Sequence, residues 1–448
     1  MNDMAIITSF FNPLNFKSRK SNLIRFMEFL KESGVDEHFY ICEILFDGQE
    51  PSVKHKNVLH LKSNSILWHK EKSLNILEKI IPETYTKIIW VDADIMWFNK
   101  NWYSDISKLL EDYNMIHPMK CCRFLDYRKQ HIYSKNSYVA EKILNGGEIP
   151  ITTKRGDLCY GFAMAFKREF FHKFGLFDRG LIGHGDFYNI ISIEENWLDT
   201  LSKLLSKDNS ITAIKVDSIF KNYIINYVDM CNKWINNKYS FYDDEIVHLY
   251  HGELTNRKYN TRSKIFSDLY FDDIFVQGSN GLYEFKESVS EYATEFFKTY
   301  FLNRKDDTIC NVDSDAYLPE ISSDGSNFMW MSDKNKFTIR NIKKIKIHLS
   351  RNCNNHTTDY INLLHNGQVF KITFDSYGKA IIELSFNEST EEFSTFSNFF
   401  VPSKIDSNSN DTRKLSCIIE KVFVIYDGKN TFDNYELYDI AYRPIQYK

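Results

Sequence analysis

The pattern of apolar and polar positions in the first third of the chain predicts strands that alternate with helices. Segment 5–11, AIITSFF, is a largely apolar run typical of a buried strand, and segment 21–34, SNLIRFMEFLKESG, has the apolar spacing of an amphipathic helix that stops at Gly34. A second strand at 38–48, a helix at 72–85 interrupted near Pro82, and a strand at 87–91, KIIWV, follow. This order predicts an α/β fold in which helices cover both faces of a mostly parallel, Rossmann-like sheet.

The pattern changes after residue 302. Segment 303–336 is polar and rich in turn-forming residues, which is typical of a linker. After it, short apolar runs are separated by turn dipeptides such as Asn366-Gly367 and Asp427-Gly428, which predicts an all-β, sandwich-like domain. We therefore expect an α/β domain at 1–302, a linker at 303–336 and a β-rich accessory domain at 337–448.

Composition narrows the classes of partner and location. The 448 residues contain 56 Lys and Arg against 60 Asp and Glu, a formal net charge of -4, so there is no general basic field and we expect no nucleic-acid partner. The eight cysteines include no C-x-x-C pair. Because the sequence shows neither a secretory leader nor an apolar run of about 18 residues, we expect a cytoplasmic protein without a transmembrane segment.

Two carboxylates follow the strand at 87–91. Asp92 and Asp94 are separated by one alanine, and ligands of parallel sheets bind beyond the carboxyl ends of the strands. If the strand period of two continues, both carboxylates face the same side and bind one hard cation, whose shell a phosphate oxygen completes. The alternative is a pair of solvated aspartates at a strand end.

The segment around these aspartates resembles the GT-A class of nucleotide-sugar-dependent glycosyltransferases. Segment 67–102, LWHKEKSLNILEKIIPETYTKIIWVDADIMWFNKNW, is similar to a bacterial and viral pattern in which W-x-K-E precedes the D-x-D strand, and the resemblance extends over about 5–265. It implies a GT-A fold, and it places near the donor nucleotide Asp92 together with Asn12, Pro13, Trp68, Lys70 and Asn75. For Trp68 a core position, and for Lys70 a solvated helix start, are the alternatives.

A second segment, 158–186, resembles the β-1,4-galactosyltransferase family. The glycines Gly161, Gly183 and Gly185 match that family's order, and with His184 they are the expected acceptor-binding residues. Asp186 is the expected catalytic base. The family has tryptophan where this chain has His184, and four acidic residues where this chain has Asp186 alone. Glycines here would let the backbone approach a sugar closely; the alternative is a surface turn.

A third segment, 245–262, contains histidines at the spacing of two galactosyltransferase metal ligands. These are His248 and His251. On an extended strand, residues three apart point to opposite faces, so we favour His251 alone over the pair unless the chain turns between them. The alternative is a core His248 and a hydrogen-bonded His251. Arg257 and Arg262 are expected to bind diphosphate oxygens.

Together these segments predict a metal-dependent glycosyltransferase that moves a hexose from a UDP-sugar to a carbohydrate or other hydroxyl acceptor, with inversion. The expected metal ligands are Asp92, Asp94 and His251, with His248 as a weaker candidate. Carboxylate and imidazole ligands suit Mn²⁺, and Mg²⁺ less well. The basic stretch 120–157 is a candidate lid or acceptor loop. A metal-dependent nucleotide-sugar hydrolase and a catalytically decayed carbohydrate-binding protein remain alternatives.

Overall fold

The protein is described from a computed structural model, whose chain divides into two compact units. Unit 1 comprises Met1–Arg304 with Gln446–Lys448, and unit 2 comprises Lys305–Ile445. No helix in the described part of the chain has the length and apolar character needed to cross a membrane. The described residues are 3–125, 129, 131–149, 158–180, 183, 185–205, 215–252, 257, 269–304, 306–307, 309–313, 320–321, 327–340, 342–351, 359–387, 390–399, 401–405, 409, 415–426 and 433–435.

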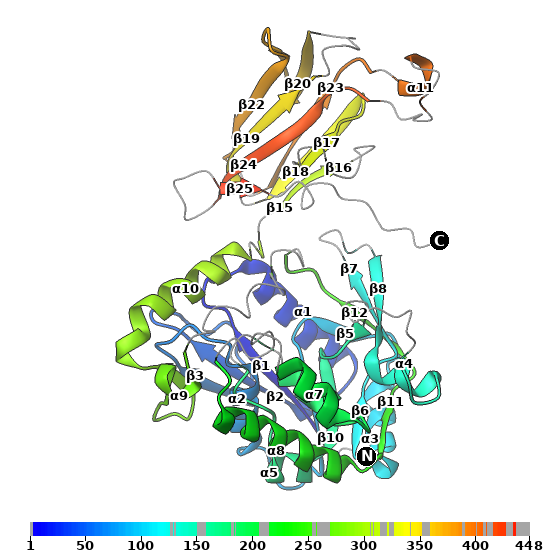
Figure 1. Ribbon diagram of the computed structural model, residues 1–448, viewed down its shortest axis with the longest axis vertical. Helices are drawn as coiled ribbons and strands as arrows, with labels where there is room; N and C mark the ends of the chain where they lie inside the picture. The colour runs from blue at the N-terminus through cyan, green and yellow to red at the C-terminus, as the bar shows by residue number, and fades with distance from the viewer. Residues whose placement is uncertain are drawn as a thin grey trace. The chain divides into compact units, whose positions relative to one another are not determined.

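A seven-stranded mixed sheet forms the centre of unit 1 (Figure 1). Four neighbouring strands are parallel, and β10 runs antiparallel to both of its neighbours, β4 and β6. The prediction of an α/β fold with a parallel-rich sheet is confirmed, although β3 and the reversed β10 were not foreseen. In sheet order the strands are β11 (Tyr239–Phe241), β6 (Met115–His117), β10 (Ala163–Lys167), β4 (Lys87–Val91), β1 (Met4–Phe11), β2 (Phe39–Leu45) and β3 (Val58–Lys62).

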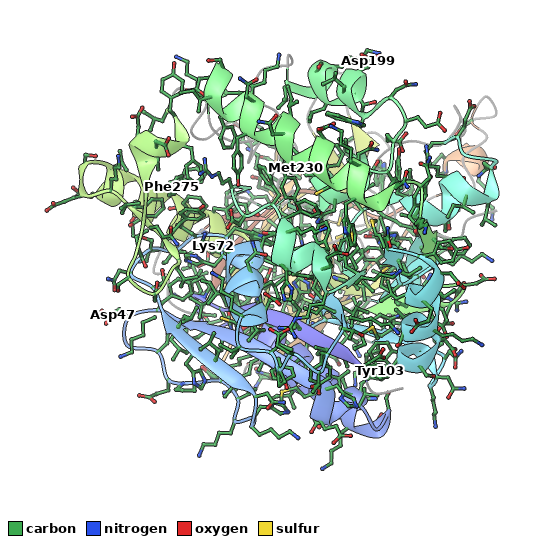
Figure 2. The ribbon with its side chains drawn as sticks, turned by 90° about the horizontal axis from the view of Figure 1, so that it is seen from below. Asp47, Lys72, Tyr103, Asp199, Met230 and Phe275 are labelled. Atoms are coloured by element: carbon green, nitrogen blue, oxygen red, sulfur yellow. The ribbon has the colours of Figure 1, made fainter. Side chains whose placement is uncertain are left out.

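Helices cover both faces of this sheet because its strands are apolar on both sides. In β1, Met4 and Ile6 belong to one buried cluster, while Ala5 and Ile7 belong to another. The first cluster includes residues of α1 (Lys17–Glu32) and α3 (Trp102–Asp112), and the second includes residues of α2 (Lys70–Glu78) and α8 (Ser218–Ile235). Figure 2 shows Lys72 of α2 and Met230 of α8 on one side of the strands and Tyr103 of α3 on the other.

A second, five-stranded sheet lies beside the end of β4. Its strand order is β5 (Ile95–Trp97), β12 (Glu245–His248), β7 (Cys121–Leu125), β8 (His131–Ser137) and β9 (Leu158–Cys159). Three residues separate the end of β4 from the start of β5. β5 pairs antiparallel with β12, so that His248 lies opposite Ile95. This pairing brings the end of β12 to the turn that contains Asp92 and Asp94.

Further elements lie in the described residues of unit 1. They are α4 (Tyr138–Leu144), α5 (Glu169–Lys173), α6 (Gly185–Ile191), α7 (Trp197–Leu205), α9 (Phe271–Ile274), β13 (Phe275–Gln277), β14 (Tyr283–Phe285), α10 (Ser290–Asn303) and two 3₁₀ helices, η1 (Asp36–His38) and η5 (Glu287–Val289). The stretch 120–157, expected as a lid or acceptor loop, supplies β7, β8 and α4 in its described residues. β7 pairs with β12 and β8 pairs with β9, and both partner strands lie outside 120–157. The composition of the stretch therefore did not reveal these pairings.

Unit 2 is β-rich, as predicted. Its first sheet has the order β15 (Ile309–Asp313), β18 (Lys334–Arg340), β23 (Thr390–Phe396), β20 (Tyr360–His365) and β21 (Gln368–Thr373). Its second has the order β16 (Glu320–Ile321), β17 (Asn327–Trp330), β24 (Ile418–Tyr426), β19 (Ile342–Ser350) and β22 (Lys379–Ser385), with β25 (Asp433–Tyr435) paired to β24. One buried cluster takes residues from both sheets, among them Phe337 and Ile347. A short helix, α11 (Pro402–Ile405), follows β23.

The segment expected as a linker, 303–336, differs from that expectation. It holds β15, β16, β17 and the start of β18, and β15 pairs with β18 from Ile309 opposite Arg340 to Asp313 opposite Lys336. Strand stability depends mainly on the neighbouring strand rather than on the composition of the segment itself. A polar segment with a partner strand therefore forms a sheet edge where composition indicates a linker.

Candidate functional site

The two aspartates lie in a turn that carries the chain from the central sheet to the second sheet. The backbone N–H of Asp92 donates to the carbonyl of Phe162 at 2.7 Å, and that of Leu249 donates to the carbonyl of Asp94 at 2.7 Å. Because β4 ends at Val91, the period of two stops there. In the structure the two carboxylates have different partners, so the strand period does not by itself direct both of them to one ion.

Asp94 lies with two histidines. Its Oδ2 is 2.7 Å from Nε2 of His251 and 3.9 Å from Nε2 of His248. One ligand atom from each of the three residues lies within 4.8 Å of the others, and both imidazoles are buried. The other carboxylate oxygen, Oδ1, is buried and accepts no hydrogen bond from the described residues. This set of donors and this unsatisfied oxygen fit a divalent cation.

The protonation states of His248 and Asp94 favour metal binding. Burial lowers the pKa of His248 to about 3, so its imidazole is neutral at neutral pH and has a lone pair to share. Burial alone would raise the pKa of Asp94, but His248, His251 and Arg257 outweigh it and hold that pKa below its usual range. A carboxylate beside a neutral imidazole is the protonation state that a metal requires.

The geometry corrects the preference for His251 alone. β12 ends at His248, and the chain turns before Gly252, whose φ is +90°. The strand rule that separates residues three apart does not apply across this turn. Both histidines therefore reach Asp94.

Asp92 is paired with Lys70 instead. The Lys70 Nζ lies 2.6 Å from Oδ1 of Asp92 and 4.1 Å from the ring centre of Trp90. Burial and the neighbouring Asp94 raise the pKa of Asp92 to about 6, although Lys70 opposes them. The predicted ligand Asp92 is not part of the three-residue group, and its Oδ1 is engaged by Lys70.

Four cationic side chains line the pocket around these residues: Arg19, Lys70, Arg257 and Arg304. Nη2 of Arg257 approaches His251 Nε2 at 2.9 Å, and Arg304 is only 2% exposed. Trp68 also lines the pocket, in edge contact with Phe11. The structure thus brings together four expected donor-binding residues, namely Trp68, Lys70, Asp92 and Arg257.

Three expected donor-binding residues do not line this pocket. The amide of Asn12 donates to the carbonyl of Phe16 at 2.8 Å and accepts from its N–H at 3.0 Å, which closes the turn that contains Pro13. The amide of Asn75 bonds both backbone groups of Leu176, at 2.9 and 2.7 Å. These side chains satisfy the backbone, a role that composition and spacing do not distinguish from ligand binding.

Asp186 lies against Gly161. A Cβ on Gly161 would be 1.9 Å from Oδ2 of Asp186, and a Cβ on Gly185 would be 2.5 Å from Cδ of Glu71. The glycines therefore make room for the protein's own carboxyl groups, where we expected room for a sugar. Burial lowers the pKa of Lys70, whereas Asp92 and, to a smaller extent, Asp186 raise it. The effect of Asp186 places its carboxyl group close to the Lys70 ammonium group.

Three predicted residues remain: Gly183, His184 and Arg262. Gly183 has a left-handed φ of +92°, and its N–H donates to the carbonyl of Gly180 at 3.1 Å, so it forms a turn. His184 and Arg262 lie outside the described residues.

Sequence reasoning missed Glu71, Arg19 and Arg304. Burial raises the pKa of Glu71 to about 8, and Asp186 adds to the increase. Glu71 is the last residue of the W-x-K-E motif, so its place in that motif was the signal that could have identified it. Arg19 and Arg304 are isolated in the sequence, and only the fold brings them to the pocket.

No protein-family model matches the sequence, and no curated protein matches it either. Among solved structures, the chain is similar to the catalytic domain of Drosophila β1,4-galactosyltransferase 7 in complex with xylobiose. The two are 12% identical, the match covers 66% of this chain and 98% of that chain, and the TM-score is 0.30. It is also similar to the galactosyltransferase LgtC, with donor and acceptor sugar analogues, at 8% identity, 67% and 96% coverage and a TM-score of 0.24. A third is the glycosyltransferase GlyE of Streptococcus pneumoniae TIGR4, at 12% identity, 53% and 44% coverage and a TM-score of 0.21. Values this low assign the chain to no family, and the geometry of the site carries the proposal below.

Proposed function

We propose that this chain is a metal-dependent glycosyltransferase of the GT-A class that moves a hexose from a UDP-sugar to a hydroxyl group of a glycan or another acceptor. The observation that carries the proposal is the group of Asp94, His248 and His251 in a pocket that four cationic side chains also line. A metal-ligand set beside excess positive charge suits a diphosphate.

Asp94, His248 and His251 would hold the ion. One carboxylate and two imidazoles leave coordination positions for diphosphate oxygens, and this mixed set suits Mn²⁺ better than Mg²⁺. When bound, the ion neutralises the charge that develops on the leaving diphosphate.

The cationic side chains would bind the rest of the diphosphate charge. Arg257 and Arg304 present planar donors that match phosphate oxygens, and Lys70 adds a point charge beside Asp92. Since Arg304 is almost fully buried, its charge acts in a region of low dielectric constant, where it is worth more than on the surface.

Asp186 is our candidate for the base. Its carboxylate lies on Gly161, and the next residue in the chain, Phe162, lines the cation-rich pocket. In this role the carboxylate would take the proton of the acceptor hydroxyl as that oxygen attacks from the side opposite the diphosphate. We therefore propose inversion at the anomeric carbon.

The test is a panel of nucleotide sugars in a thermal-shift measurement with and without Mn²⁺. A ligand at about 100 times its Kd adds about 2.7 kcal/mol to the free energy of unfolding, so a true donor raises Tm. We expect a Mn²⁺-dependent increase for at least one UDP-sugar, and its loss in Asp94→Asn and Asp94→Ala, because the ion loses its carboxylate ligand. Asp47→Ala, at an exposed position labelled in Figure 2, is the control and should behave as the unaltered protein does.

Four outcomes would contradict the proposal. An increase in Tm that persists without metal would show that donor binding does not need the ion, and a Mn²⁺-dependent increase that persists in both Asp94 variants would move the metal site elsewhere. Hydrolysis of the donor without transfer to any acceptor would favour a nucleotide-sugar hydrolase. Glycan binding with no turnover would favour a carbohydrate-binding protein.

A further inference from the structure

A second cavity of about 480 Å³ lies in unit 1. This volume is within the range of roughly 300 to 1,000 Å³ typical of small-molecule sites. Its wall includes the aromatic side chains Tyr138, Tyr160 and Phe187 and the carboxylates of Glu148, Glu194 and Glu195.

Neighbours of the candidate base line both this cavity and the cation-rich pocket. Tyr160 lines the cavity and Phe162 lines the pocket, and the residue between them is Gly161, on which the Asp186 carboxylate lies. On the helix side, Phe187 of the cavity directly follows Asp186. Asp186 is therefore flanked, along the chain and at Gly161, by residues that line the cavity and the pocket.

The aromatic wall of the cavity is ordered by its own contacts. The ring centres of Tyr138 and Tyr160 are 5.1 Å apart, and those of Tyr160 and Phe187 are 5.7 Å apart in an edge arrangement. All three rings are partly buried against the core of unit 1. Such rings offer large apolar faces with few freely rotating bonds, which suits contact with the C–H face of a sugar ring.

The acidic wall carries more negative than positive charge. Glu194 accepts from the Tyr138 hydroxyl at 2.7 Å and from Lys142 Nζ at 3.0 Å, so Lys142, the one lysine among the described lining residues, already balances Glu194. Glu148 and Glu195 are exposed. Ionised carboxylates accept hydrogen bonds from sugar hydroxyl groups and repel another anion.

We propose that this cavity binds the acceptor as a sugar ring that carries no acidic group. This inference rests on the proposed function. The sugar stacks on Tyr160 and Phe187, and Glu195 accepts hydrogen bonds from its hydroxyl groups. Its reactive hydroxyl oxygen forms the bond to the anomeric carbon, the bond from that carbon to the diphosphate breaks with its electron pair on the diphosphate oxygen, and Asp186 takes the hydroxyl proton.

The binding test uses a matched pair of probes. Methyl glucoside and methyl glucuronide differ in one carboxylate, and the methyl glycosides of galactose, xylose and N-acetylglucosamine extend the neutral set. Saturation-transfer NMR on the full chain, with and without Mn²⁺ and UDP, measures binding. We expect at least one neutral glycoside to bind and the glucuronide to bind at least about tenfold more weakly, since like charges disfavour it.

The variants locate the binding. Glu195→Gln should weaken the neutral glycoside about fivefold, because it removes a charged acceptor, and Glu195→Lys should reduce discrimination against the glucuronide. Asp199→Asn on α7, an exposed position labelled in Figure 2, makes a similar charge change outside the cavity wall and should leave binding unchanged.

The outcomes separate this inference from the proposed function. Equal binding of glucuronide and glucoside, absence of binding by every neutral probe, or identical affinity in the Glu195 variants would overturn the assignment of the cavity. Loss of Mn²⁺-dependent UDP binding, with sugar binding retained, would overturn the proposed function and leave the sugar site in place.

Discussion

Lys70 shows how one side chain organises the candidate site. Its Nζ lies 2.6 Å from Asp92, and its pKa is affected by three carboxyl groups, those of Asp92, Asp186 and Glu71. Burial alone would lower the pKa of Lys70, but these groups raise it above its usual range, so the ammonium stays charged. The charged lysine is thus the partner of Asp92, while the histidines are the partners of Asp94.

Asp186 provides the prediction at the scale of the residue. Asp186→Asn removes the proton acceptor but keeps the shape, so kcat should fall by roughly 10² to 10⁴ while donor and metal affinity stay almost unchanged. Steady-state kinetics and calorimetry with UDP and Mn²⁺ measure the two quantities, and NMR gives the anomeric configuration of the product. A product that retains the donor's configuration, or a variant whose kcat is unchanged, would remove Asp186 from the role of base.

At the scale of the element, His117 joins three parts of the fold. It ends β6, its Nδ1 lies 2.6 Å from the Ser137 hydroxyl, and its Nε2 donates to the carbonyl of Gly161 at 3.2 Å. Ser137 in turn accepts from the N–H of Ala140 at the start of α4. One buried neutral imidazole therefore connects the central sheet, α4 and the glycine that carries Asp186.

This arrangement predicts a loss of stability in acid. Burial lowers the pKa of His117 from 6.5 to about 4, so between these values the unfolded chain binds the proton that the folded chain excludes. The stabilisation is complete above the unfolded pKa and is lost as pH falls, on the order of 2 kcal/mol between about pH 7 and about pH 5. Denaturant unfolding of the unaltered protein and His117→Gln at both pH values measures it. The variant should be less stable at about pH 7 and show a smaller decrease; an equal decrease in both would exclude His117 as the source.

At the scale of the whole molecule, the last helix of unit 1 ends next to a residue of the site. α10 ends at Asn303, Arg304 lines the cation-rich pocket, and the chain divides into units after Arg304. The sequence placed the boundary at 302, two residues too early to include this arginine.

Two fragments test the consequence. A fragment ending at residue 308 should fold and bind a UDP-sugar with Mn²⁺, since the central sheet and the residues of the site precede that point. A fragment ending at residue 302 should bind roughly 10- to 150-fold more weakly, because a charge-assisted hydrogen bond is worth roughly 1.5 to 3 kcal/mol. Thermal unfolding and calorimetry check folding and affinity. Equal affinity of the two fragments would show that Arg304 does not contact the donor, and insolubility of both would show that unit 1 needs unit 2.

Local sequence determined the parts of this protein that depend on neighbours in the chain. The apolar runs that form β1 and β4, the spacing that forms α1, and the position of Asp92 and Asp94 just after β4 follow from periodicity within a few residues. Tertiary structure decided the reversed direction of β10 and the strands within 303–336. It also decided the ion pair between Lys70 and Asp92 and the approach of His248 to Asp94 across the β5–β12 pair. Each of these depends on contacts between residues far apart in the chain, which bring together charges and backbone groups that no single segment contains.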